Sequence, residues 1–367
     1  MKIKVKKDIL IKGLSKVITS INPRSTLPIL SNLLIETIDK NRLKITGTDL
    51  EIGIIHTIDA DIIEEGNITI PAKKFNDIVR ESPEEDIEIT VTKNNSITIK
   101  CGKAFFKLMG LPQDDYPKFP KFSLENASVL KQETLKECID LTLFAISTDE
   151  TRYVLNGALV IIKNKELKMI ATDGRRLAII QKGIDINKSF SLEAIIPTKA
   201  LHEVNRNIQN EEKVHIVELS NQIVFHINNT TIISRLIEGH YPNYEQVIPK
   251  EENIIVKIKR GKMLSAIRRV SLLTSLESQA IKLDVIKTNK MILSSRSPNL
   301  GESKEEIDIE IIKGNEVTIG FNPTYLIDVL KNLEIEDIML YLISPEKPGV
   351  IRGHEGYLYI IMPMQIG

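Results

Sequence analysis

The sequence predicts an α+β fold in which one structural unit is repeated three times. Two helical segments recur in each third of the 367 residues, and alternating apolar residues between them indicate antiparallel strand pairs. The residues that open the second helical segments, Pro71, Pro197 and Asn322, are about 125 residues apart. Each unit is expected to run strand, helix, three strands, helix, three strands, with both helices packed on sheets.

The first helix of each unit follows a short alternating stretch such as "MKIKVKKD". Apolar residues at helical spacing give each helix one buried face. These residues are Leu10, Leu14, Val17, Ile18 and Ile21 in the first unit, Leu135, Ile139, Leu143 and Ile146 in the second, and Met263, Ile267 and Val270 in the third.

A strand pair follows the first helix of each unit. Thr48-Asp49 recurs as Thr172-Asp173, 124 residues later. Asp173-Gly174 predicts a tight hairpin turn, because glycine accepts a positive φ at little cost.

The second helix of each unit is predicted in "IPAKKFNDIVRES", "IPTKALHEVNRNIQ" and "GFNPTYLIDVLKNLE". Thr198 and Asn322 are suitable N-cap residues, and Pro323 suits the first helical position. Further strand pairs close each unit, and the third ends in the apolar "YIIMPMQIG".

Composition favours a protein of the cytoplasm. The two cysteines, Cys101 and Cys138, have no CxxC partner and are expected to be buried free thiols in a reducing compartment. No apolar run of 18 residues exists, and the N-terminus has the alternation of a strand rather than the apolar block of a signal peptide. We therefore expect cytoplasmic localisation and no membrane association.

Charges balance overall, with 49 basic and 49 acidic residues, but they are not evenly distributed. Acidic residues concentrate in strands and turns such as "SPEEDIEI" and "GESKEEIDIE", whereas the predicted helices carry basic residues on the faces opposite their apolar stripes. If the helices share one direction, a neutral chain presents a basic surface to a polyanion. Ordinary solvated helix faces are the alternative. The basic residues are Lys12, Lys16, Lys73, Lys74, Arg80, Lys136, Lys199, Arg206, Lys262, Arg268, Arg269 and Lys331.

Seven stretches, in order along the whole chain, resemble one known family. They are "RSTLPILSNLLIE", "TGTDLEI", "RYVLNGALV", "ATDGRRLA", "YPNYEQVIP", "GFNPTYLIDVLKNL" and "YIIMPMQI". The family is the bacterial replicative sliding clamp, the beta subunit of DNA polymerase III.

This resemblance implies three similar clamp domains, at residues 1–123, 124–249 and 250–367. It implies that two chains pair head to tail as a homodimer, in a closed ring with helices lining the hole. The implied function is that of a non-catalytic processivity factor in DNA replication. The ring encircles double-stranded DNA without sequence preference and tethers the DNA polymerase III alpha subunit and other proteins with a clamp-binding motif. No phosphate-binding loop is present, so ring opening is left to a separate ATP-dependent clamp loader.

By the same resemblance, eight residues are expected to contact DNA. The chain departs from the family's usual residues at Asp149, where Gln is frequent, and at Val154, where a second Tyr is frequent. The expected contacts are Arg24, Lys73, Lys74, Arg80, Arg152, Tyr153, Lys199 and Arg206.

The expected dimer interface joins "KAFFKLMG" of the first domain to "VSLLTSLES" of the third. Phe106 and Leu108 would pack near Leu272 and Leu273, although burial within their own domains is an alternative. Opposite charges flank the two segments and suit head-to-tail pairing. They are Lys103 and Lys107 on one side and Glu302, Glu305 and Glu306 on the other.

A partner-peptide groove is expected at the C-terminal strand, where flexible methionines suit varied ligands. A buried closing strand is the alternative for Ile360 and Ile361. Arg175 replaces a frequent His of the family, and Gln246 stands where Arg can occur. The expected groove residues are Leu155, Thr172, Gly174, Arg175, Arg176, Leu177, Pro242, Val247, Asn322, Tyr325, Ile361, Met362, Pro363 and Met364.

Two other function classes compete. An enzyme is disfavoured, because the sequence lacks HExxH and GxSxG motifs and its six histidines have no metal-ligand spacing. Asp173 with Arg175 and Arg176 is the one suggestive acid–base group, and a local salt bridge explains it. We therefore expect no catalytic residues, no metal and no cofactor. A peptide-binding repeat scaffold that never meets nucleic acid predicts mixed charge on all six helices.

Overall fold

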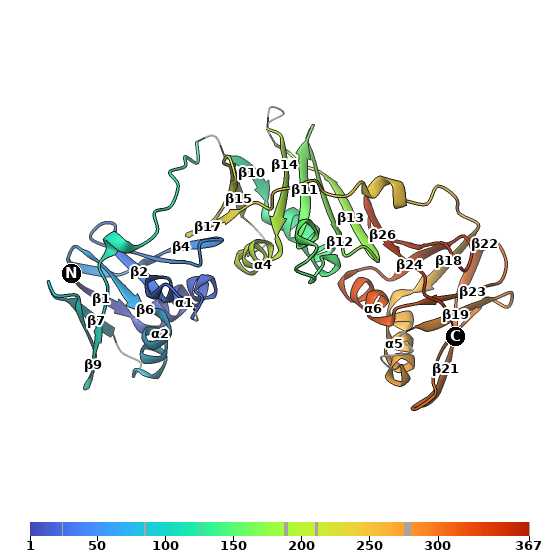
Figure 1. Ribbon diagram of the computed structural model, residues 1–367, viewed down its shortest axis with the longest axis horizontal. Coiled ribbons are helices and arrows are strands. Elements are labelled where there is room, and N and C mark those ends of the chain that lie inside the picture. The colour runs from blue at the N-terminus through green and yellow to red at the C-terminus, as the bar shows by residue number, and fades with distance from the viewer. Residues whose placement is uncertain are drawn as a thin grey trace. The chain divides into compact units, whose positions relative to one another are not determined.

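The computed structural model describes residues 1–23, 25–83, 86–125, 127–186, 190–209, 212–274 and 280–366 (Figure 1). They form two compact units. The first unit contains Met1–Glu133 and Lys199–Leu236, and the second unit contains Thr134–Thr198 and Ile237–Gly367.

The chain passes through the same order of elements three times. The first third contains β1 (Lys2–Lys6), α1 (Lys7–Val17), β2 (Asn32–Thr37), β3 (Arg42–Thr48), β4 (Ile52–Asp59), β5 (Asp61–Glu64), β6 (Asn67–Pro71), α2 (Ala72–Glu81), β7 (Asp86–Val91), β8 (Ser96–Cys101) and β9 (Ala104–Met109). The middle third contains β10 (Ser128–Lys131), α3 (Gln132–Asp140), β11 (Gly157–Lys163), β12 (Glu166–Thr172), β13 (Arg176–Gly183), β14 (Leu192–Pro197), α4 (Thr198–Asn207), β15 (Lys213–Glu218), β16 (Gln222–Ile227) and β17 (Thr230–Arg235). The last third contains β18 (Ile254–Lys259), α5 (Arg260–Val270), β19 (Ile281–Ile286), β20 (Lys290–Ser297), β21 (Gly301–Asp308), β22 (Glu310–Lys313), β23 (Val317–Phe321), α6 (Pro323–Asn332), β24 (Asp337–Leu342), β25 (Gly349–Arg352) and β26 (Tyr357–Ile361).

The α+β class and the three repeats are confirmed, but the predicted order omits a strand in every repeat. β6 and β14 run directly into the second helix, and one residue, Asn322, separates β23 from α6. The predicted helical segments begin at Ile70, Ile196 and Gly320 and so include the last two residues of each strand. A buried strand of about five residues has no alternation of its own that would separate it from the helix. The first and last repeats also carry a further short strand, β5 and β22, at a sheet edge.

Antiparallel sheets form the framework of each unit. The first unit contains sheets of the order β5-β1-β7-β8-β9 and β10-β15-β16-β17-β4-β3-β2-β6. The second unit contains sheets of the order β14-β11-β12-β13-β26-β25-β24-β18-β22 and β21-β20-β19-β23.

Each large sheet joins strands from two successive repeats, and we call such a junction a seam. At the first seam β17 pairs with β4, and Ile232 lies opposite Ile54. At the second seam β26 pairs with β13, and Tyr359 lies opposite Ala178. Consecutive repeats are thus joined by main-chain hydrogen bonds as well as by the connecting segments.

Most of the predicted apolar faces of the first helices are buried, but Ile18, Ile21 and Leu143 lie beyond the ends of α1 and α3 and are half-buried. Leu10, Leu14 and Val17 of α1 are fully enclosed, as are Met263 and Ile267 of α5. In the first unit α1 packs on β4 and α2, and in the second unit α5 packs on α6. Burial of each such side chain stabilises the fold by roughly 1.5–3 kcal/mol relative to exposure. Within the described residues no helix is long and apolar enough to span a membrane.

The N-caps of the second helices differ from one another. Asn322 caps α6, because its side-chain oxygen accepts the backbone N–H of Thr324 at 2.9 Å, and Pro323 begins the helix as predicted. The N-cap prediction for Thr198 is wrong. Thr198 is already helical, and its hydroxyl donates to the carbonyl of Asn156 at 2.6 Å.

Hairpin turns β3–β4 and β12–β13 have the same hydrogen bonds. In each turn the threonine hydroxyl donates to the carbonyl four residues later, and the next aspartate accepts two backbone N–H groups. Both turns require a positive φ at one position. Gly174 occupies it in the second turn, with φ 85°, but Leu50 occupies it in the first, with φ 77°. A leucine in the left-handed region costs about 1–2 kcal/mol.

Replacement of Leu50 by glycine is therefore expected to stabilise the first unit. Leu50 is 44% exposed, so little packing is lost. Relief of the φ strain exceeds the backbone entropy cost of glycine, roughly 0.5–1 kcal/mol. Thermal unfolding of Leu50→Gly should show a higher midpoint than the unmodified chain. Leu50→Ala, which keeps the strain, should show no increase. A midpoint for Leu50→Gly at or below that of Leu50→Ala contradicts the assignment of strain.

Candidate functional site

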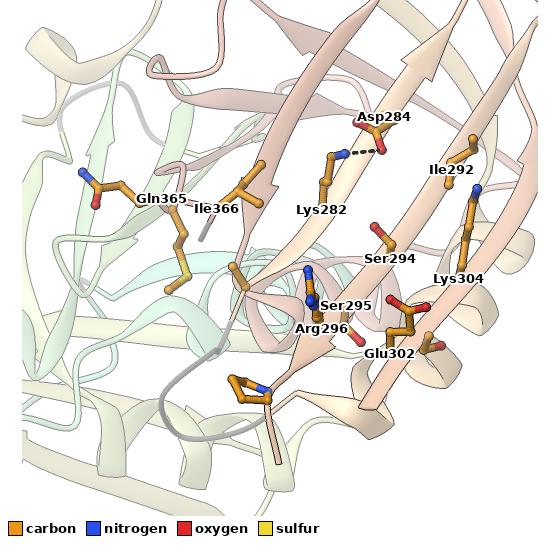
Figure 2. Close-up of a pocket in the computed structure, with 14 residues that line it drawn as sticks. Lys282, Asp284, Ile292, Ser294, Ser295, Arg296, Glu302, Lys304, Gln365 and Ile366 are labelled. Atoms are coloured by element: carbon orange, nitrogen blue, oxygen red, sulfur yellow. Dashed lines mark ion pairs between the residues drawn. The ribbon is translucent and has the colours of Figure 1, made fainter. Parts of the chain in front are cut away.

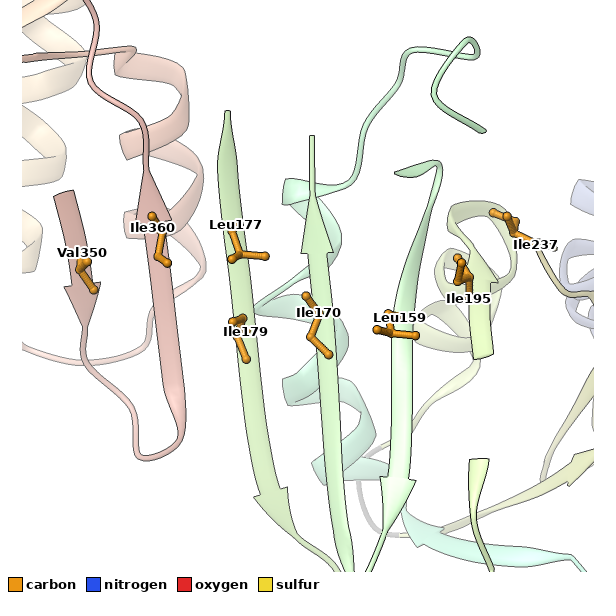
Figure 3. Packing of buried hydrophobic residues seen from close by; sticks show 8 residues of the cluster. All are labelled: Leu159, Ile170, Leu177, Ile179, Ile195, Ile237, Val350 and Ile360. Carbon is orange, nitrogen blue, oxygen red and sulfur yellow. The ribbon is translucent and has the colours of Figure 1, made fainter. Parts of the chain in front are cut away.

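The second unit carries an apolar cluster on the face of its nine-stranded sheet that is turned away from α6 (Figure 3). Tyr359 of β26 faces α6, since its hydroxyl donates to the carbonyl of Tyr325 at 2.9 Å. Its neighbour Ile360 therefore faces the other way, opposite Leu177. The cluster consists of Leu159, Ile170, Leu177, Ile179, Ile195, Ile237, Val350 and Ile360.

The connecting segment after β17 covers part of this cluster. Tyr241, Tyr244 and Ile248 pack against it, and the Tyr241 hydroxyl donates to the carbonyl of Ile170 at 3.4 Å. Burial raises the pKa of Tyr241, so its hydroxyl stays protonated. Val247 of the same segment remains 48% exposed. The segment leaves apolar surface accessible beside a buried cluster.

All of the predicted groove residues lie in the second unit, some on the cluster's face of the sheet and others, Arg176, Asn322, Tyr325 and Ile361, on the side of α6. Leu177 belongs to it, Leu155 is 7% exposed, and Met362 is 42% exposed. Ile361 is fully buried and faces the helix side, opposite Arg176, so its side chain is part of the core. The remaining members are Thr172 at the end of β12, Gly174 and Arg175 in the turn, Arg176 on β13, Pro242 before a short helical turn (Tyr244–Val247), Asn322 and Tyr325 at the start of α6, and Pro363 and Met364 after β26.

Arg176 connects the β12–β13 turn to α6. Its guanidinium forms ion pairs with Asp173 at 3.0 Å and Asp328 at 2.5 Å, and lies over the Tyr325 ring at 4.4 Å. The side chain is only 10% exposed. The predicted local salt bridge with Asp173 is present, and Asp328 adds a partner 152 residues away.

Two backbone hydrogen bonds hold the residues after β26. The N–H of Met362 donates to the backbone carbonyl of Arg175 at 2.9 Å. The N–H of Met364 donates to the backbone carbonyl of Gly320, in β23, at 2.8 Å. Isolated bridges Thr69–Leu111 and Ile195–Ile237 follow β9 and β17 in the same way. The terminal segment is therefore the third copy of a repeated element.

A pocket lies on the outer face of the four-stranded sheet, beside the last described residues (Figure 2). Gln365 and Ile366 border one side of it. Lys282 and Asp284 of β19 form an ion pair at 3.0 Å on its floor. Glu302 and Lys304 of β21 line the opposite side.

The predicted DNA contacts fall into two groups. Lys73, Lys74 and Arg80 are exposed on α2, and among the described residues they have no side-chain partner. Lys199 instead forms an ion pair with Asp49. Arg206 pairs with Glu203 at 2.7 Å and donates to the carbonyl of Lys16 at 2.9 Å.

Arg152 is also held within its own unit. It lies 3.6 Å from Asp149 and donates to the carbonyl of Asp173 at 3.0 Å. A hydrogen bond from the Thr151 hydroxyl lowers the pKa of Asp149, which keeps this carboxylate charged beside Arg152. Tyr153, next to it, is 60% exposed. Arg24 lies outside the described residues.

The predicted interface residues lie at two sheet edges. β9 is an edge strand on which Phe106 and Leu108 are half-buried, while β21 is the edge of the four-stranded sheet. Leu272, on a short helical turn after α5, is 75% exposed, and Leu273 is half-buried. Two of the acidic residues that were expected to flank the interface already bind basic residues of the same chain. Arg269 donates to Glu305 at 2.8 Å, and Lys290 pairs with Glu306.

Three adjoining stretches match the parts of one protein family. The N-terminal domain of the DNA polymerase III beta subunit matches residues 1–120, its central domain residues 129–243, and its C-terminal domain residues 245–365. This chain belongs to the DNA polymerase III beta subunit family, the beta sliding clamps.

Individual sliding clamps are similar over the full length. A beta sliding clamp of Staphylococcus aureus is 35% identical over 381 residues, covering 100% of this chain and 99% of the relative. The DNA polymerase sliding clamp of Bacillus subtilis shares 32% identity at a TM-score of 0.94, with all of both chains covered. A putative DNA polymerase III beta subunit from Eubacterium rectale shares 34% identity at a TM-score of 0.93, again with full coverage.

Sliding clamps are non-catalytic processivity factors, so the enzyme alternative is excluded by family membership. The ion pairs that hold Lys199 and Arg152 were not foreseen. The Lys199 partner lies 150 residues away in the sequence, and no local pattern could reveal it. The Arg152 partner is only three residues away, so the spacing of Asp149 and Arg152 is a sequence signal from which this ion pair could be predicted.

Proposed function

We propose that two copies of this sliding clamp pair head to tail in a closed ring around duplex DNA and tether the replicative polymerase to its template. Full-length membership of the beta sliding clamp family carries this proposal. The domains in the ring would span residues 1–123, 124–249 and 250–367, and the three matched family ranges support these boundaries. The proposed partners are the DNA polymerase III alpha subunit, an ATP-dependent clamp loader and other proteins with a clamp-binding motif, in the cytoplasm.

Two open sheet edges support the head-to-tail pairing. β9 ends one sheet of the first unit, and β21 ends the four-stranded sheet of the second. An exposed edge strand offers unpaired N–H and C=O groups to another chain. Because β9 and β21 differ, a closed dimer pairs unlike edges twice. Phe106 and Leu108 of β9 would meet Leu272 and Leu273 beside β21, which would supply the apolar part of the interface.

The proposed DNA contacts are not equivalent. Lys73, Lys74 and Arg80 have no side-chain partner among the described residues and can meet phosphates directly. Arg152, Lys199 and Arg206 would have to leave or share Asp149, Asp49 and Glu203. Such weak, exchangeable phosphate contacts carry no sequence information and permit sliding. Retention then depends on closure of the ring; Arg24 and Tyr153 complete the proposed set.

Retention on DNA should therefore depend on topology more than on salt. Clamps loaded on circular DNA are expected to stay bound when salt rises from about 50 to 200 mM, a change that weakens simple ionic binding by about a thousandfold or more. Linearising the circle at the same salt should release them. The measurement is clamp recovery with DNA after gel filtration. Equal loss from circular and linear DNA would point to ionic binding by an open chain, as a peptide-binding scaffold with incidental basic residues would give.

We also propose that the apolar surface beside the Figure 3 cluster receives short peptide segments of the partner proteins. Val247, next to Ile248 of the covering segment, and Met362, two residues after Ile360 of the cluster, are exposed, whereas Leu177 of the cluster is buried. Methionine adapts its shape to different apolar ligands, which suits a surface with several partners. Exposed Arg175 and Gln246 at the margin would tune which peptides bind.

Loss of this surface should weaken binding of the polymerase while the ring still encircles DNA. Deletion of residues 363–367 removes the Met364–Gly320 bridge, and Met362→Ala removes exposed apolar area. Each change should weaken binding of the polymerase alpha subunit by about tenfold or more, measured by surface plasmon resonance, while dimerisation and DNA retention persist. Ile63→Ala, which removes a 57% exposed apolar residue of the first unit, is the matched control. Unchanged polymerase affinity in both test variants contradicts the peptide site.

A further inference from the structure

Two histidines of the first unit lie directly opposite each other on neighbouring strands. His215 of β15 pairs with His226 of β16, and their ring centroids are 6.1 Å apart, with the ring planes inclined by 55°. Both residues are half-buried, so solvent still reaches them. Eleven positions separate them in the sequence, and it is the register of this hairpin that brings the two rings together.

Both imidazoles lie on one face of the eight-stranded sheet. Their chain neighbours Ile216 and Phe225 point to the other face and are 2% and 1% exposed. On the histidine face Val129 of β10 lies opposite His215 and is half-buried. The surroundings of the two rings are therefore partly apolar, which favours direct contact between the imidazoles and a ligand that they share.

Thr231 of β17 orients the ring of His226. It lies opposite His226 on the side away from β15, and its Oγ1 is 2.9 Å from Nδ1 of the ring. Nδ1 and Nε2 lie on opposite edges of an imidazole, on either side of the line from Cβ through Cγ. With Nδ1 against Thr231, Nε2 is therefore on the edge that faces His215.

The same hydrogen bond suits one tautomer of His226. The Thr231 hydroxyl can accept the hydrogen of Nδ1–H, and this tautomer leaves a lone pair on Nε2. A histidine that binds a metal ion usually donates its other ring N–H to an oxygen atom in this way. The arrangement around His226 is thus that of a metal ligand with its supporting hydrogen bond.

From this geometry we infer that His215 and His226 form a binding site for a divalent late transition-metal ion, such as Ni²⁺, Cu²⁺ or Zn²⁺. Nε2 of His226 would be one ligand and the imidazole of His215 the other. Imidazole nitrogens suit these ions, whereas Mg²⁺ and Ca²⁺ prefer oxygen ligands. The site is independent of the proposed ring and of the proposed peptide surface.

Two imidazoles fill only part of a coordination sphere. Within the part of the chain that the structure describes, no group of three His, Cys, Asp or Glu side chains could hold a metal ion. Water would supply the remaining ligands, so binding should be reversible. Nitrogen ligands lie about 2.0–2.1 Å from zinc, and rotation about the side-chain bonds can bring the two rings to one ion. A bound ion would join β15 to β16 and stabilise the folded first unit.

Titration with Ni²⁺ tests the site on the full chain, without a histidine tag, by isothermal titration calorimetry. His215→Asn and His226→Asn should each weaken Ni²⁺ binding by about tenfold or more, because a single imidazole remains. His202→Asn removes an exposed histidine of α4 and is the matched control, which should bind as the unmodified chain does. Equal Ni²⁺ affinity in the unmodified chain and in both test variants overturns the site.

Thr231→Val tests the orientation of His226. It keeps the branched shape of the side chain and removes the hydroxyl, so Nε2 should lose its support as a ligand. Loss of such a supporting group typically weakens metal binding by about 10–100-fold. Unchanged Ni²⁺ affinity in Thr231→Val, with binding lost in His226→Asn, overturns the role assigned to Thr231.

Thermal unfolding gives a second measurement and also checks that each variant folds. Ni²⁺ should raise the unfolding midpoint of the unmodified chain and of His202→Asn, because the ion binds the folded hairpin. The same concentration should leave the midpoints of His215→Asn and His226→Asn nearly unchanged. An equal rise in all four chains would place the bound ion elsewhere and contradict the assignment.

Discussion

Antiparallel strand pairing between successive repeats is the constraint on which this structure depends. Each large sheet is continuous only because the last strand of one repeat completes the sheet of the repeat before it. Main-chain pairing fixes both the spacing and the face of every side chain, since a shift of one residue would turn each buried residue to the other face. His56 at the first seam illustrates the fit. It hydrogen-bonds to Thr230 at 2.8 Å, and burial lowers its pKa to about 4, so it stays neutral at the junction near pH 7.

The seams also position the candidate functional residues. Arg176 lies opposite Ile361 at the second seam, and its ion pair with Asp328 links the seam to α6. Lys199 of α4 reaches Asp49 in the turn that precedes β4, which reinforces the first seam in a comparable place. Some basic residues, such as Lys199 of α4, therefore help to hold successive repeats together. Basic residues of the helices that have no acidic partner among the described residues remain fully available to a polyanion.

Local features of the fold could be predicted from the sequence, and long-range features could not. Helical periodicity located the buried faces of α1 and α5, and Asp173-Gly174 located a hairpin turn, because these depend on residues close in the chain. β14 was missed because its last two residues, Ile196 and Pro197, open the segment that was predicted as helix, and so short a strand has no alternation of its own. The strand pairing at the seams could not be predicted from the sequence. Ile54 and Ile232 are separated by more than a hundred residues, and no periodic signal links them. The sequence does not distinguish exposed Met362 from buried Ile361, because the difference depends on the direction in which each side chain points.

Hydrogen–deuterium exchange tests the proposed head-to-tail ring, in which the edge strands β9 and β21 would meet where two copies join. At concentrations where the chain is dimeric, peptides covering residues 104–109 and 301–308 should be protected, and dilution to monomer should release them. Peptides covering residues 230–235, whose seam lies within one chain, should stay protected throughout. Rapid, concentration-independent exchange of both edge strands, in a chain that still encircles DNA, would contradict the account.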